Sequence, residues 1–114
     1  MSMAEVLSHV RRINGVGGYI LLDKSGNIIT HSAEMKAPQK MSKMVYSCGK
    51  SLSSIGNKYF KYGSFSRKQN RDILIFPVGN YKYYLGVVKQ ADSRTFETAV
   101  AVMAFLNVLV GKRD

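Results

Sequence analysis

The sequence contains little cysteine, little acid and no long apolar run. Its single cysteine, Cys48, excludes an internal disulfide, which suits a reducing cytoplasm. The longest apolar stretch, "AVAVMAFLNVLV" from Ala99, is about a dozen residues, shorter than a bilayer span requires. The opening "MSMAEVLSHVRR" carries an early acid and no apolar core, unlike a signal peptide. We therefore expect a soluble, cytoplasmic protein.

Acidic residues are scarce, and this scarcity gives the chain its strongest compositional feature. Seven Asp and Glu stand against 17 Lys and Arg, for a net charge of +10. From Lys36 to Arg71 there are nine basic residues and no acid. This region predicts an anionic partner, which could be an acidic protein face, a membrane surface or a nucleic acid, or it is simply a solubilising surface.

The residue types that perform catalysis or hold metals do not cluster in the sequence. The seven acids are scattered, and no pair of them suggests general acid–base chemistry. One cysteine and the two distant histidines, His9 and His31, do not supply a zinc ligand set. Cys48 falls on the apolar side of a predicted helix, as a core thiol does. We expect no catalytic residue, no metal and no cofactor.

Helical and strand periodicities predict a single α+β domain over residues 1–114. The expected order is helix, two strands, a long helix, three strands and a final helix (α-β-β-α-β-β-β-α), which gives a five-stranded antiparallel sheet flanked by helices. The predicted elements are a helix over 3–13, strands over 18–23 and 27–32, a helix from Pro38 to about Tyr59, strands over 64–69, 72–78 and 81–89, and a helix over 94–111. Gly79-Asn80 is typical of a two-residue hairpin connection, and Asp92 or Ser93 would cap the last helix.

The glycine-rich stretch "INGVGGYILLD", residues 13 to 23, could suggest a phosphate-binding loop. A dinucleotide loop follows a strand and opens a helix. Here a helix precedes the glycines and a strand follows them. The glycines are therefore interpreted as residues that permit a tight turn and close approach of the backbone.

The helix that begins at Pro38 is the clearest pattern in the chain. Its apolar residues recur every three or four positions, and lysines gather on the opposite side. Between these sides lie the small residues Ser42, Gly49, Ser53 and Gly56. Glycine inside a helix costs about 1 kcal/mol relative to alanine, which indicates that something packs very close there. That neighbour could be the chain's own sheet or a second copy of the helix.

The last helix is apolar around nearly its whole circumference. Phe96, Val100 and Met103 lie on one side, while Val102 and Phe105 cover much of the rest. A helix that is apolar on every side is usually buried on every side. In so small a domain, we expect another chain to cover part of it.

Several local patterns together resemble the Roadblock/dynein light chain family over about residues 3 to 111. These are the "GVGG" entry into the first strand, the "DKSG" turn, the long second helix and the "PVG" hairpin before the last strand. The resemblance implies a non-enzymatic adaptor, scaffold subunit or regulator of small Ras-like GTPases. It also implies a homodimer or heterodimer with a second Roadblock-type protein, made by pairing the third strand and packing the second helix against its mate.

Carried onto this sequence, the resemblance names two sets of residues. The dimer interface would comprise Val45, Gly49, Leu52, Ser53, Gly56, Ser64, Phe65 and Ser66. The GTPase would dock across the paired second helices, on Lys40, Lys43, Ser47, Lys50, Ser54 and Lys58. The many cations of this region disfavour a homodimer, because like charges repel across a two-fold axis. An acidic heterodimer partner would relieve this repulsion.

Two other interpretations stay open from the sequence. The basic region 36–71, with the aromatic and basic segment "YFKYGSFSRKQNR", could make a nucleic-acid or anionic-surface binding module, in which cations follow phosphates and rings stack on bases. Alternatively, the aromatic rings of this segment, Tyr59 and Phe60, pack the end of the long helix against the core, and its cations are solvated on an edge strand. A third interpretation is a profilin-like or PAS-like domain that holds a small ligand, although no polar cluster marks the predicted core.

Overall fold

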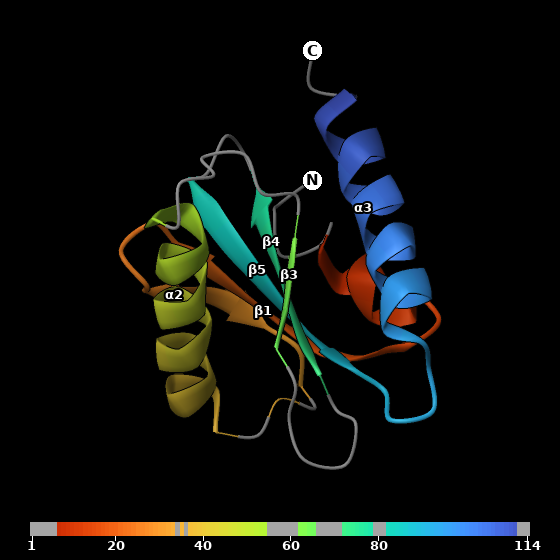
Figure 1. The fold of residues 1–114 in the computed structure, drawn as a ribbon, viewed down its shortest axis with the longest axis horizontal. Helices are drawn as coiled ribbons and strands as arrows, with labels where there is room; N and C mark the ends of the chain where they lie inside the picture. The colour runs from red at the N-terminus through yellow and green to blue at the C-terminus, as the bar shows by residue number, and fades with distance from the viewer. Residues whose placement is uncertain are drawn as a thin grey trace.

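The structure, a computed structural model, describes residues 7–33, 35, 37–54, 62–65, 72–78 and 82–111. The elements in chain order are η1 (His9–Arg12), β1 (Val16–Asp23), β2 (Ile28–His31), α2 (Pro38–Ser54), β3 (Gly63–Phe65), β4 (Ile73–Val78), β5 (Tyr83–Lys89) and α3 (Thr95–Gly111). The strands form one antiparallel sheet in the order β2-β1-β5-β4-β3. Helix α2 covers one face, and α3 with η1 covers the other (Figure 1). The predicted α+β class and five-stranded antiparallel sheet are confirmed.

Side chains that alternate along the strands build two apolar cores, one on each face of the sheet. In β1, Tyr19 and Leu21 pack on the α3 side, while Ile20 and Leu22 pack on the α2 side. This alternation follows from the two-residue period of a β-strand. Because both faces are covered, β1 is apolar over most of its length rather than alternating with polar residues.

The boundaries differ from the predicted ones at three places. Within the described residues, the first helix is a short 3-10 turn, His9–Arg12, that follows helical residues at 7 and 8. Strand β5 begins at Tyr83, which pairs with Val78, and the predicted hairpin connection at Gly79-Asn80 lies outside the described residues. Helix α3 begins at Thr95, one residue later than predicted. The hydroxyl of Ser93, one of the two predicted caps, donates instead to the carbonyls of Gln90 at 2.9 Å and Gly15 at 3.3 Å.

Gly15 of the glycine-rich stretch lies in the turn that leads into β1, as the order of elements predicts. Gly15 has φ of 97°, and a β-carbon on it would clash with Thr98 Oγ1. Its carbonyl accepts the Gln90 backbone N–H at 2.7 Å. The stretch therefore joins the start of β1 closely to the loop before α3, where only a residue without a side chain fits.

A buried lysine holds the loop between β5 and α3. The Lys89 side chain is buried, and its Nζ donates to the carbonyls of Ser93 at 2.7 Å and Gln90 at 3.1 Å. The Thr95 hydroxyl donates to Asp72 Oδ2 at 2.9 Å, which joins the start of α3 to the start of β4. These bonds satisfy polar groups that burial would otherwise penalise.

Among the described residues, no helix has the length and hydrophobicity that crossing a membrane requires.

Candidate functional site

The outer face of α2 is basic. Lys40, Lys43 and Lys50 are exposed on the side of the helix away from the sheet, together with Ser47. Lys50 Nζ lies 5.5 Å from the centroid of the Tyr46 ring, within the range of a cation–π contact. We call Lys40, Lys43, Ser47 and Lys50 the lysine stripe. The structure thus brings together, on one exposed surface, these four of the six residues that the resemblance assigns to partner binding.

The small-residue flank of α2 packs against the chain's own sheet. Val45 is fully buried, and Ser42 is buried with its hydroxyl donating to the Gln39 carbonyl at 2.8 Å. A β-carbon on Gly49 would lie 2.9 Å from Cδ1 of Tyr84 in β5. Of the two neighbours that the sequence leaves open for this flank, the described part of it contacts the sheet.

This finding concerns two residues of the predicted dimer interface. Val45 and Gly49 contact the sheet of their own subunit, and the interface itself stays a prediction. The glycine is needed because the Tyr84 ring reaches the helix backbone. The remaining α2 members of the predicted interface are not settled: Leu52 and Ser53 lie in the last turn of α2, and Gly56 lies outside the described residues.

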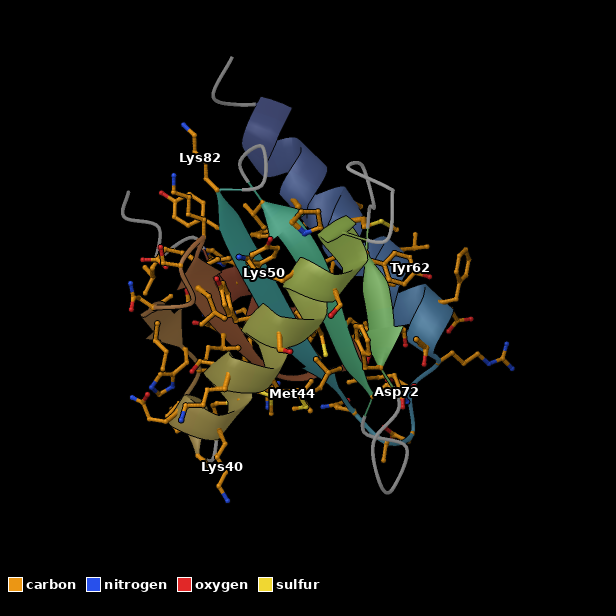
Figure 2. All side chains as sticks on the ribbon, turned by 60° about the vertical axis from the view of Figure 1, so that its left-hand side comes forward. Lys40, Met44, Lys50, Tyr62, Asp72 and Lys82 are labelled. Carbon is orange, nitrogen blue, oxygen red and sulfur yellow. The ribbon has the colours of Figure 1, made fainter. Side chains whose placement is uncertain are left out.

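The two flanks of α2 face different edges of the sheet. Tyr46 packs on Gly26, in the turn between β1 and β2, so its flank faces the β2 edge. Each residue of an α-helix is turned about 100° from the last, which places Met44 and Cys48 on the other flank, toward β4 and β3. Figure 2 shows Met44 and Lys50 on opposite flanks of the helix.

Three half-buried residues lie on the α2 side of the sheet, two on this flank of the helix and one in the terminal strand β3. Met44 and Cys48 of α2 and Phe65 of β3 all pack against the core cluster on the α2 side of the sheet. We call these three residues the edge cluster. Because β3 is the terminal strand, Phe65 lies at the edge where another strand could pair. The sequence analysis places Cys48 in the core and does not name Met44, because the half-buried state of both residues depends on the strand order.

Other predicted site residues are placed as follows. Ser64 is exposed in β3, paired with Leu74 of β4, and Phe65 is paired with Ile73. Ser54 lies in the last turn of α2. Lys58 and Ser66 lie outside the described residues, as do six of the nine basic residues of region 36–71.

The titratable groups near α2 show two perturbed pKa values. Burial raises the pKa of the Cys48 thiol, which keeps it protonated at neutral pH. The backbone N–H of Asn27, followed by its side-chain amide, lowers the pKa of Asp23 in the β1–β2 turn. Among the described residues, no group of three His, Cys, Asp or Glu could hold a metal ion.

Helix α3 exposes part of its apolar surface. Phe96 is 67% exposed and Val100 is 43% exposed, one turn apart on the side away from the sheet. On the opposite side, Ala99 and Val102 are fully buried. The expectation that another chain covers this surface stays a prediction.

Comparison with known proteins identifies the fold. No protein-family model matches the chain, and no curated protein matches it. The Roadblock/LC7 domain from Streptomyces avermitilis is 11% identical, with 98% of each chain covered and a TM-score of 0.73. MglB from Myxococcus xanthus is 13% identical, covering 96% of this chain and 94% of that one, with a TM-score of 0.71. LokiProfilin1, solved in complex with rabbit actin, is 15% identical over 96% of each chain, with a TM-score of 0.62.

The similarity to these structures extends over nearly the whole chain and defines a fold class. The chain has the Roadblock/LC7-type fold, as the sequence resemblance predicts. The profilin structures show that this arrangement of sheet and helices is shared more widely.

Proposed function

We propose that this protein is a cytoplasmic, non-enzymatic adaptor that dimerises along β3 and α2 and regulates a small Ras-like GTPase, or is a scaffold subunit of a larger complex containing one. The observation that carries the proposal is the terminal position of β3 in the described sheet, together with the edge cluster, within a Roadblock/LC7-type fold. The lysine stripe is the proposed docking surface for the GTPase.

Dimerisation is supported by the chemistry of the sheet edge. A terminal strand presents unpaired N–H and C=O groups that can pair with a strand of another chain. In a two-fold dimer, β3 would pair antiparallel with its mate, since each strand contacts its own symmetry copy. The edge clusters of both subunits would then meet along the joined sheet and bury Met44, Cys48 and Phe65, which one chain leaves half-buried.

The identity of the second subunit is part of the proposal. It is either a second copy or another Roadblock-type protein. Lys40 lies on the outer surface of α2, and the chain carries a net charge of +10, so two copies repel. A second subunit rich in acid would form the more stable pair at low salt. Raising the salt concentration screens this repulsion and would shift the balance toward the homodimer.

Two measurements test the proposal. Light scattering at increasing salt should show a dimer of this chain at high micromolar concentration or, with a co-purified subunit, a heterodimer. Affinity capture from the native cytoplasm, with bound proteins identified by mass spectrometry, should recover a Ras-like GTPase that a Lys43→Glu/Lys50→Glu variant fails to recover. A strict monomer that captures no GTPase and no Roadblock-type subunit would contradict the proposal.

A further inference from the structure

Three exposed lysines from separate segments lie toward one end of the sheet. The register pairs Asp23 with Tyr83, so Lys24, which follows β1, lies beside Lys82, which precedes β5. Helix α2 reaches the same end, since Gly49 packs on Tyr84 and Tyr46 packs on Gly26. Lys50 therefore joins the other two, and all three are exposed. In Figure 2, Lys82 lies toward the top of the view, Lys40 lies at the bottom, and Lys50 lies between them.

The described acids lie mainly at the other end of the sheet. Three of the four precede β4, follow β5 or begin α3, namely Asp72, Asp92 and Glu97. Asp23 is the remaining acid, and its carboxylate accepts N–H groups from Ser25 and Asn27 of its own turn. The lysine end therefore carries an excess of positive charge that is distinct from the charge balance of the far end.

We propose that the sheet end formed by Lys24, Lys50 and Lys82 docks a carboxylate-rich surface of a protein partner. The inference rests on the proposed function, because it names the chemistry by which the partner is recognised. It extends the docking surface from α2 alone onto the β1–β2 turn and the segment before β5.

The chemistry of the cations favours a protein partner over phosphate. All three are lysines, which act as flexible point charges, whereas arginine supplies the planar fork that suits phosphate recognition. The described arginines Arg11, Arg12 and Arg94 lie at the opposite end of the sheet. Three lysines alone also attract an anionic membrane only weakly, since stable membrane attachment takes a second signal.

The test uses the full chain and a synthetic polyglutamate peptide as probe. Amide chemical shifts recorded by NMR during titration should change around residues 24, 50 and 82. The variant Lys24→Glu/Lys82→Glu should weaken binding by roughly tenfold at low salt, as two reversed surface charges would do. The variant Arg12→Glu/Arg94→Glu has the same net charge and reverses two exposed cations at the far end, so it should change affinity by less than about twofold.

Two outcomes would overturn the inference. One is an equal loss in both variants, which would mean that net charge alone attracts the probe. The other is binding to heparin or to phosphatidylserine vesicles that needs Lys24 and Lys82, with polyglutamate binding unaffected by their reversal. Thermal unfolding confirms that both variants fold. Since the probe contains no GTPase and the variants leave the β3 edge intact, failure here leaves the dimer and GTPase capture to be judged separately.

Discussion

Helices α2 and α3 cover opposite faces of the same sheet and present different chemistry to solvent. Helix α2 buries Val45 and shows lysines outward, whereas α3 buries Val102 and shows Phe96 and Val100 outward. Each helix packs on its own face of the sheet through buried side chains that include small or β-branched residues. The difference lies in the outer surfaces, and it indicates that the two sides of the molecule meet different partners.

The inner flank of α2 should be the most sensitive to substitution. In Gly49→Leu, the new side chain must displace the Tyr84 ring, whose Cδ1 would lie 2.9 Å from the β-carbon. Overpacking of this kind typically costs 1–3 kcal/mol, and we expect a loss of about 3 kcal/mol in the free energy of unfolding, measured by urea denaturation. We therefore expect Gly49→Leu to affect folding more than dimerisation.

Ser47→Leu is the matched control for Gly49→Leu. Ser47 is exposed on the same helix, so leucine there should change stability by less than about 0.5 kcal/mol. If Gly49→Leu left the free energy of unfolding unchanged and altered only the oligomeric state, the close packing of Gly49 on Tyr84 would be refuted.

The two flanks of α2 should differ in their effect on dimerisation. Met44→Arg places a charge in the edge cluster, which would have to be desolvated when β3 edges pair, and we expect the dimer dissociation constant to rise by roughly a hundredfold. Lys43→Arg keeps the charge and lies on the other flank, so its dimer should match the wild type. Sedimentation equilibrium measures both, and equal dissociation constants for the two variants would remove the edge cluster from the interface.

How far the sequence could predict this molecule differs between its fold and its site. Alternation in β1 and the 3-4 rhythm of α2 depend on local periodicity, so the order and type of the elements could be predicted. Which flank of α2 faces the β3 edge depends on strand order and on the Tyr46–Gly26 contact, and both are long-range. For that reason the sequence alone predicts neither the contact of Gly49 with Tyr84 nor the side of the sheet on which Met44 lies.

The lysine end of the sheet shows the same limit. Lys24 and Lys82 are far apart in sequence, and they become neighbours only through the β1–β5 register. The sequence analysis therefore considers only the run of basic residues from Lys36 to Arg71 as a charged surface. A predicted strand order would have been the signal needed to find the cluster, because antiparallel pairing of the first and last strands brings these two positions together.

The β1–β2 turn should give a smaller, pH-dependent effect. The pKa of Asp23 is lowered from 3.8, chiefly because the Asn27 backbone N–H donates to its carboxylate. A lowered pKa means that the stability from this group is present above the unfolded-state value and is lost as pH falls through the folded-state value. Asp23→Asn should therefore lower the melting temperature slightly at neutral pH and by less below pH 3.8. Melting curves in which the difference grew toward acid would contradict this.

The outer surface of α3 should give the smallest effect on the stability of one chain. Val100→Ser changes a side chain that is 43% exposed, and we expect less than about 0.5 kcal/mol in the free energy of unfolding at dilute concentration. Val102→Ser makes the same chemical change two residues later, where the side chain is fully buried, and should cost about 2 kcal/mol or more. Repeating the measurement at high protein concentration separates two outcomes. If another chain covers α3, as its composition predicts, Val100→Ser becomes destabilising as concentration rises, because the mutation then weakens a buried contact. If its cost stays constant at every concentration, no second copy covers this surface, and a partner for α3 must be a different protein.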